Sequence, residues 1–286
     1  MKAAEQILDW GDIARVKLLF SDDKLGPRLQ NLDFFCLLLR KWHHNRDGFD
    51  RVFELVDEVS GSMIHEQWGN RLFCLAAGAG CMPVIQRLVH IAQNDSQLRN
   101  ELLCGSWPGH QLSGTKDRVH QSIGEAILGN QVDVVRYLLG VHGMEAHLHY
   151  RNTHGENVLH LASRNCNPDI SRLLVPCFQE GVHQADNQGD TVLMRVITSS
   201  SAARNRYEAA SILLTQSGTD WNSHLRGVQR HPLIVTVQLG DAEMVRILVH
   251  IGNVDPRTIL NPENEEHIPQ ILQAIRAHAD AGSTLD

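Results

Sequence analysis

The chain contains 286 residues, of which 42% are hydrophobic, and its formal net charge is −7. This composition is typical of a globular protein and excludes a disordered or membrane-embedded chain. Because the basic residues stand singly, the chain also lacks the positive runs that bind a phosphate backbone. The longest strongly apolar run, Phe34 to Leu39, is far shorter than the roughly 20 residues of a membrane helix, and the start lacks the apolar region of a secretory signal. We therefore expect a cytoplasmic protein, with the nucleus as the alternative, that binds neither nucleic acid nor membrane.

The N-terminal part predicts helices without a clear repeat signature. Residues 3–20 contain a Gly-Asp pair followed by an apolar cluster, and residues 34–56 have the rhythm of two helices. The end of a stack of repeats has one face that meets water instead of a neighbour, so terminal units are atypical. We interpret residues 1–62 as an N-terminal helical cap and a degenerate repeat.

After this cap the chain repeats itself, and the repeats decide the fold. Four segments of equal length align without gaps; each has a small residue at its fourth position, a Gly, Asn or Cys four residues later, and then an apolar cluster. A fifth copy, residues 193–214, matches at both ends and is five residues longer in the middle. We expect its extra residues, within 198–207, to lengthen the turn between its two helices. The four equal segments are residues 73–89, 123–139, 159–175 and 233–249.

Each copy predicts two short helices joined by a turn. The small residue lets the first helix approach its neighbour closely, and the turn falls at the Gly, Asn or Cys. The second helix has one apolar face, as at Val134, Val135, Leu138 and Leu139. One such pair buries too little apolar surface to offset about 1–2 kcal/mol of backbone entropy per residue. The pairs therefore must stack to be stable.

Four local motifs give the repeats a family resemblance. They are "GENVLHLA" at residues 155–162, "QGDTVLM" at 188–194, "HPL" at 231–233 and "GDAEMVRILV" at 240–249. These motifs resemble the ankyrin repeat, a unit of about 33 residues with two helices and a β-turn finger. The resemblance implies an all-α solenoid of stacked helix–turn–helix units with short β-turn fingers, which we place at residues 63–260. It also implies a structural hydrogen-bonding role for His160.

Two features complete this organisation. The connection between the first and second clear repeats, residues 101–120, is unusually long for a compact domain. At the other end, Pro262 is followed by a helical pattern with acidic residues in its first turn, which favours the start of a helix. We interpret residues 261–286 as a C-terminal capping helix.

The ankyrin resemblance implies a recognition surface on the fingers and on the exposed sides of the first helices, which form the concave face of such a stack. An exposed tryptophan is typical of interface hot spots, and arginines can clamp acidic groups of a partner. By register, the predicted partner-binding residues are Trp68, Asn70, Arg118, His120, Glu125, His154, Glu156, Arg164, Asp190, Arg195 and Arg230.

The sequence lacks the common catalytic motifs, such as G-x-S-x-G, G-x-G-x-x-G and H-E-x-x-H. We therefore predict a non-enzymatic scaffold that binds a protein partner, with no cofactor and no metal. The alternative is a solenoid that binds a small molecule, or acts on it, in a pocket roofed by residues 101–120. In that case His110, His120 and Glu156 are the candidate acid or base groups.

Overall fold

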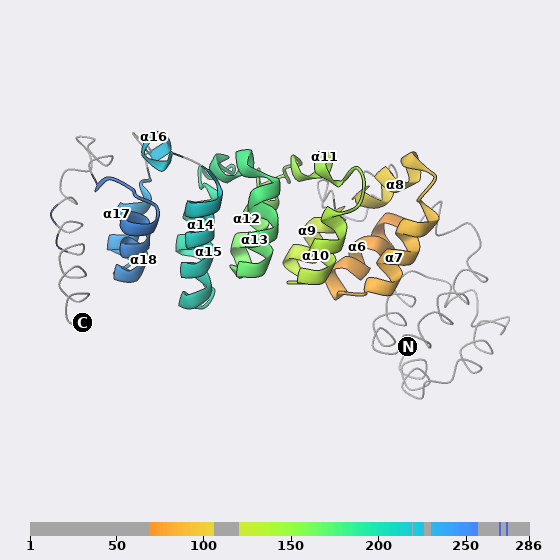
Figure 1. The fold of residues 1–286 in the computed structure, drawn as a ribbon, viewed down its shortest axis with the longest axis horizontal. Coiled ribbons are helices and arrows are strands. Elements are labelled where there is room, and N and C mark those ends of the chain that lie inside the picture. The colour runs from red at the N-terminus through yellow and green to blue at the C-terminus, as the bar shows by residue number, and fades with distance from the viewer. Residues whose placement is uncertain are drawn as a thin grey trace, which may run out of the picture. The chain divides into compact units, whose positions relative to one another are not determined.

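A computed structural model describes residues 69–105, 120–218, 220–225 and 230–256, together with the isolated positions Pro269 and Gln273. The chain divides into two compact units, Met1–His147 (unit 1) and Leu148–Asp286 (unit 2). Figure 1 shows the described elements of each unit, coloured along the chain. The predicted N-terminal cap at residues 1–62 lies outside the described residues, as does the predicted C-terminal cap at 261–286 apart from those two positions.

In unit 1 the described residues form two helix pairs, α6–α7 and α9–α10, and their first helices α6 and α9 pack against each other. A two-residue antiparallel ladder joins the ends of the long connection, pairing Cys104 with Gln121 and Gly105 with His120. The elements are α6 (Gly69–Ala79), α7 (Met82–Ile91), α8 (Ser96–Leu103), β1 (Cys104–Gly105), β2 (His120–Gln121), α9 (Ser122–Leu128), α10 (Val132–Leu139) and α11 (Met144–Leu148), which reaches the unit boundary.

Two glycines explain how closely α6 and α9 approach. A Cβ atom added at Gly129 would lie 2.1 Å from the carbonyl oxygen of Gly78, which is fixed backbone. A Cβ added at Gly78 would in turn touch the backbone of Glu125. The small residues at the end of each first helix therefore allow the close packing of repeats in unit 1.

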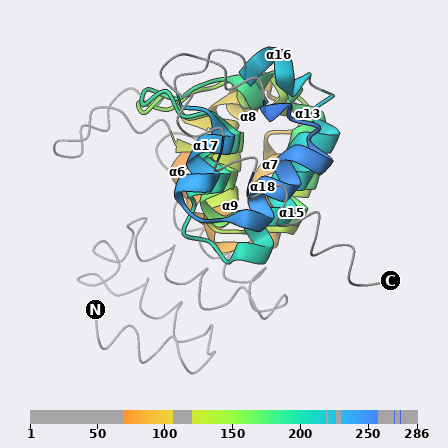
Figure 2. The same cartoon turned by 90° about the vertical axis from the view of Figure 1, so that its left-hand side faces the viewer.

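In unit 2 the described residues form three helix pairs in two layers. The first helices α12, α14 and α17 contact one another in order, and the second layer runs from α13 through α15 to η3. Seen end-on in Figure 2, α17 belongs to one layer and α15 and α18 to the other. The elements are α12 (Val158–Asn165), α13 (Pro168–Cys177), η2 (Gln179–His183), α14 (Val192–Thr198), α15 (Ala203–Gln216), α16 (Trp221–Leu225), α17 (Pro232–Gln238), α18 (Ala242–Arg246) and the π-helical turn η3 (Ile247–Ile251).

The turn between the helices of a repeat uses a left-handed residue at the predicted position. The φ angles at Gly80, Asn130, Cys166 and Gly240 are +76°, +59°, +47° and +67°. Glycine adopts this conformation without steric penalty, and Asn tolerates it better than most residues. The predicted turns of the four equal copies are therefore confirmed, including the one at the buried Cys166.

The fifth copy differs from our expectation. We predicted that its extra residues, 198–207, lengthen the turn between two helices. Instead the turn takes only residues 199–202, and α15 begins at Ala203 and runs for 14 residues. Arg206 and Tyr207 in this longer helix both contact Asp241 of the next repeat, at 2.9 and 2.8 Å. The insertion therefore lies mainly in the second helix, and the turn is only one or two residues longer than in the other copies.

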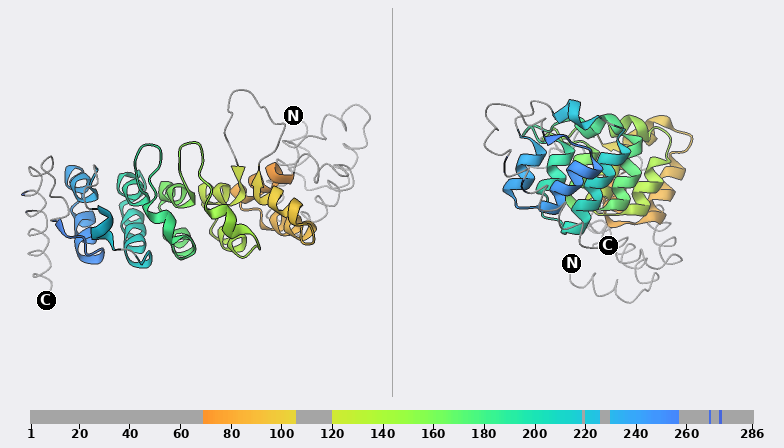
Figure 3. Two further views of the ribbon diagram at one scale, coloured as in Figure 1. Left: turned by 90° about the horizontal axis from the view of Figure 1, so that it is seen from above. Right: turned by 60° about the vertical axis from the view of Figure 1, so that its left-hand side comes forward.

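A β-turn finger precedes each of the first two first helices of unit 2, and Figure 3 shows loops that project from one side of the helices. In the finger before α14, Ala185 pairs with Thr191 across a turn closed by a hydrogen bond from Gly189 to Asp186. The side chains of Asn157, Thr191 and His231 then accept N–H groups at the starts of α12, α14 and α17. Each cap satisfies a backbone donor that the helix leaves unpaired. None of the helices in the described ranges is long and apolar enough to span a bilayer.

Candidate interaction surface

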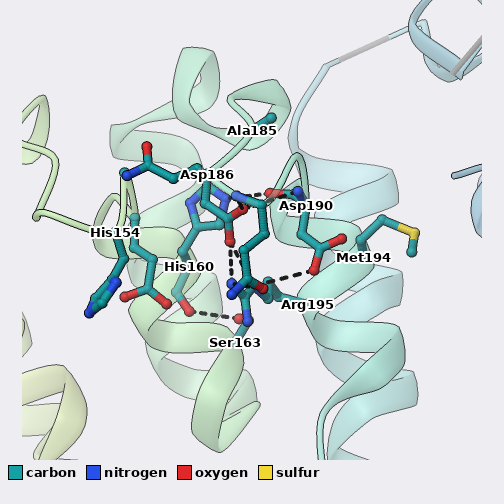
Figure 4. Close-up of polar contacts among 12 residues, drawn as sticks. His154, His160, Ser163, Ala185, Asp186, Asp190, Met194 and Arg195 are labelled. Carbon is teal, nitrogen blue, oxygen red and sulfur yellow. Dashed lines mark hydrogen bonds and ion pairs between the residues drawn. The ribbon is translucent and has the colours of Figure 1, made fainter. Parts of the chain in front are cut away.

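The fingers of unit 2 carry a cluster of paired charges, which we call the finger charge cluster. Three almost fully buried carboxylates belong to it, and each is bound by an arginine that stays partly exposed. Figure 4 shows the centre of the cluster, with Arg195 between Asp186 and Asp190. Its members are Glu156, Asp186, Asp190, Arg164, Arg195 and Arg230.

Asp186 is the most enclosed of these carboxylates. It accepts the backbone N–H groups of Gln188 and Asp190, at 2.8 and 3.1 Å, which forms the finger turn. Arg195 binds it through Nε at 2.8 Å and also through Nη2. Burial raises the pKa of Asp186, but the hydrogen bonds from Arg195 and from the backbone outweigh this effect and hold the pKa below its usual value. The carboxylate is therefore ionised at neutral pH.

Asp190 connects two repeats. Its Oδ1 accepts a hydrogen bond from Nη1 of Arg230, which precedes α17, and its Oδ2 lies 3.7 Å from Nε of Arg195 on α14. Its backbone carbonyl oxygen lies 3.1 Å from Nε2 of His160 on α12. One residue of this finger therefore touches the repeat before it and the repeat after it.

Glu156 closes the other end of the cluster. Nη2 of Arg164 lies 3.0 and 2.7 Å from its two carboxylate oxygens, and Asn152 donates to it at 2.8 Å. Burial alone would raise the pKa of Glu156, but hydrogen bonds from Arg164 and Asn152 lower it below the usual value. The positive charge of Arg195 lowers the pKa further. The arginines of α12 and α14 thus act on one buried carboxylate.

His160 has the structural role that the resemblance implied. Its ring is buried, with Nδ1 2.8 Å from the side-chain oxygen of Asn157 and Nε2 3.1 Å from the carbonyl oxygen of Asp190. Burial lowers its pKa, so the imidazole is neutral at physiological pH. The ring fastens the finger before α14 to the start of α12.

Several predicted partner-binding residues are not at an accessible surface. Asn70 is buried and donates a hydrogen bond to the carbonyl oxygen of Leu102 at 2.9 Å, which fixes α6 to α8. Asn70 therefore cannot contact a partner, and including it was an error. The carboxylates of Glu156 and Asp190 are also hidden, because arginines of the same chain cover them. Only their arginines reach the surface.

The remaining predicted residues are placed as follows. His154 is exposed on a finger and Glu125 is partly exposed on α9, whereas Trp68, His110 and Arg118 lie outside the described residues, as does the side chain of His120.

The alternative role of Glu156 as an acid or base is disfavoured by the structure. A catalytic carboxyl needs a pKa near the working pH, whereas the pKa of Glu156 is lowered by partners that already occupy its oxygens.

Sequence reasoning missed Asp186, although "DNQG" carries the signal for it. An Asp three residues before a turn Gly bonds to the backbone two residues on, which is typical of an Asx turn. It also missed the exposed apolar side chains Leu75 and Leu128 in unit 1, which are 45% and 39% exposed. The alignment of the repeats carries the signal for both. Leu75 aligns with Arg195 and Leu128 aligns with Arg164, and both arginines were predicted to face outward.

The first helices present two outward positions in every repeat, three residues apart and therefore on one helix face. We call these positions, together with the fingers, the recognition face of each unit. In unit 1 the outward positions hold Leu75, Gly78, Glu125 and Leu128; in unit 2 they hold Leu161, Arg164, Arg195, Thr198, Val235 and Gln238. All ten residues are exposed or partly exposed.

Among the described residues, no group of three or more His, Cys, Asp or Glu side chains could hold a metal ion. His149 is exposed, and its Nδ1 lies 2.7 Å from Oε1 of Glu180. Its ring also meets the edge of Phe178. These contacts are those of a surface histidine in a connection between repeats.

Comparison with known families agrees with the geometry. Residues 123–224 match the family model for ankyrin repeats, in three copies, and this span contains the helix pairs α9–α10, α12–α13 and α14–α15. Residues 123–224 thus form ankyrin repeats, which generally serve as modules for protein interaction. No curated protein sequence matches the chain.

Proposed function

We propose that this protein is a non-enzymatic ankyrin-repeat scaffold that recognises a protein partner through its recognition face, and that it works in the cytoplasm. In a stack of repeats, inward positions must stay apolar or small because they pack against the next repeat. The outward positions are free of this requirement. Here they differ from repeat to repeat in size, polarity and charge, as a surface that fits a non-repeating partner should.

The exposed apolar side chains carry this proposal. Among the described residues, the large hydrophobic side chains with substantial exposure are Leu75, Leu128, Leu239 and Ile251. Leu75 and Leu128 lie on first helices, and Leu239 is the C-cap of α17, which is also a first helix. Exposed apolar groups with polar surroundings are typical of protein-binding surfaces. Three of the four therefore belong to first helices and only Ile251 lies in the second layer, which favours the recognition face over the second helices.

Site-specific photo-cross-linking tests the proposal. A benzophenone amino acid would replace Leu128 or Gln238 on first helices, and the matched controls would replace Gln86 or Thr215 on second helices. All four side chains are exposed, so the substitutions should leave the fold intact. In cells, irradiation should give the same discrete adduct from the first pair, and mass spectrometry would identify the cross-linked protein. Adducts from the second pair alone would contradict the proposal.

A further inference from the structure

The finger charge cluster is built so that its negative charges are hidden and its positive charges are displayed. The carboxylates of Glu156, Asp186 and Asp190 are at most 8% exposed, whereas the side chains of Arg164, Arg195 and Arg230 are 50%, 28% and 53% exposed. Arg151 adds an exposed guanidinium that donates to the carbonyl oxygens of Gly155 and Ala185. The surface over the fingers is therefore positive, although the whole chain carries a net charge of −7.

Each arginine of the cluster also keeps N–H donors that the described residues do not use. Arg164 binds Glu156 through Nη2 alone, which leaves Nε and Nη1. Arg195 binds through Nε and Nη2, which leaves Nη1, and Arg230 binds through Nη1, which leaves Nε and Nη2. The guanidiniums are thus fixed on one side by a buried carboxylate and open on the other.

Fixing an arginine in this way has a known effect on binding. Ordering a long flexible side chain on association costs about 0.5–1.5 kcal/mol, and an arginine that is already held avoids part of that cost. A buried ion pair is weak evidence for stability, because apolar side chains of similar size would serve the core equally well. We therefore interpret the three ion pairs at the fingers as a means of holding the arginine side chains in place for binding, rather than as a means of stabilising the fold.

We propose that the three arginines bind an extended acidic segment of the partner, whose Asp or Glu carboxylates recur at about every third residue. This inference rests on the proposed function, and it names the chemistry of the partner. Arg164, Arg195 and Arg230 belong to three consecutive repeats, and packed helices lie about 8–10 Å apart. An extended chain advances about 3.3 Å per residue, so about three residues span one repeat. Guanidinium pairs with carboxylate through short, charge-assisted hydrogen bonds.

The test measures binding of short fluorescent peptides to the full chain by anisotropy. One peptide carries Glu at every third position between Gly, Ser and Ala; the second has the same composition with its Glu residues adjacent; the third has Gln for Glu; the fourth has a single phosphoserine. The spaced Glu peptide should bind at least tenfold more tightly than the Gln peptide and severalfold more tightly than the clustered one. Added salt should weaken its binding, because surface charges are screened.

Paired substitutions locate the binding without leaving a buried charge unmatched. Glu156→Gln with Arg164→Gln, and Asp190→Asn with Arg230→Gln, should each lower the affinity for the spaced Glu peptide at least fivefold. The matched control is Arg172→Gln, because Arg172 on the second helix α13 is also paired with acidic residues, Asp169 and Glu208. It should bind like the parent protein. If a paired variant unfolds, Arg164→Lys and Arg230→Lys serve instead. They keep the positive charge but lose the planar set of guanidinium N–H donors, so they should still weaken binding.

Three results would overturn the inference. Acidic recognition is excluded if the Glu and Gln peptides bind equally well, or if no peptide binds. In that case the cross-links from Leu128 and Gln238 would still test the proposed function independently. Equal losses in Arg172→Gln and in the paired variants would show non-specific attraction. Binding of the phosphoserine peptide alone would assign the arginines to phosphate instead of carboxylate.

Discussion

The recognition faces of the two units follow the same register but differ in chemistry. Where unit 1 has Leu75 and Leu128, unit 2 has Arg195 and Arg164, each tied to a carboxylate buried beneath it. The layers behind these faces are alike, since both units pair a first and a second helix around apolar side chains. The difference shows that packing determines the inward positions, while the outward positions can be changed from repeat to repeat without changing the fold.

A substitution at the close contact between α6 and α9 in unit 1 should cause the largest loss of stability. Gly129→Ala would place a methyl group 2.1 Å from the Gly78 carbonyl oxygen, so α6 and α9 must separate. We expect unit 1 to lose about 3 kcal/mol of stability, which is at the upper end of overpacking effects. Urea denaturation measures this loss. Gly140→Ala is the control, because its Cβ would lie 3.4 Å from the nearest atom, and a loss as large there would refute the packing argument.

The two recognition faces should respond oppositely to loss of an outward side chain. Arg195→Gln leaves the buried carboxylate of Asp186 without its cation, so unit 2 should lose roughly 2–3 kcal/mol; the value lies near the low end for buried pairs because Arg195 is partly exposed. Leu128→Gln in unit 1 should change stability by less than about 0.5 kcal/mol, because Leu128 is already exposed. Thermal unfolding of both variants checks the contrast, which fails if their melting temperatures shift equally.

Acid should lower the stability of unit 2, which contains His183 and His231. Burial lowers the pKa of His231 to about 4, and burial together with the charge of His224 lowers that of His183 to about 4. An unfolded histidine binds its proton near pH 6.5, so the unfolded state takes up protons first as the pH falls. Stability is therefore complete above about pH 6.5 and is lost as the pH falls from there towards 4. Between pH 7 and 5, His231 alone should account for about 2 kcal/mol.

His231→Thr tests this assignment. Threonine occupies the equivalent cap position before α14, at Thr191, so the variant keeps a cap for α17. Urea denaturation at pH 7 and pH 5 should show a smaller acid-induced loss in the variant than in the parent protein. Below about pH 4, protonation of Asp186 and Glu156 should destabilise unit 2 again, since their lowered pKa values stabilise the fold only while they are ionised. An unchanged pH dependence in His231→Thr would exclude His231 as the source.

The smallest effect concerns the turn of unit 1. Asn130 has a φ of +59°, which glycine adopts freely and alanine does not. Asn130→Ala should therefore be about 1 kcal/mol less stable than Asn130→Gly. Comparing these two variants by denaturation cancels the loss of the Asn side chain. Equal stability would mean that the left-handed turn is not required at this position.

The sequence predicted the repeats because packing imposes them. Gly80, Asn130, Cys166 and Gly240 align in the sequence and all adopt the left-handed turn, since each stands where the first helix of its repeat gives way to the second. Outward residues were harder to predict, because exposure depends on neighbours that the repeat pattern does not contain. Asn70 falls at a finger by register, yet α8, an element outside the repeat, covers it.

The charge cluster illustrates the same limit. Arg195 and Arg230 were predicted to face a partner, and their side chains do reach the surface. The pattern could not show that Asp186 and Asp190 would already bind them, because the pairing links Arg230 to an acid 40 residues away. Likewise, the extra residues of the fifth copy became part of α15, because their side chains find partners in the next repeat.

The long α15 has a consequence for how the last described repeats unfold. In a one-dimensional nearest-neighbour description, each repeat has an intrinsic stability and a coupling to the next. Asp241 caps α18 by accepting the Met244 N–H, and the same carboxylate binds Arg206 and Tyr207 from the preceding repeat. The start of α18 therefore depends on a neighbour's side chains. The coupling term across this boundary is raised, so these two repeats should melt as one cooperative block instead of fraying one at a time.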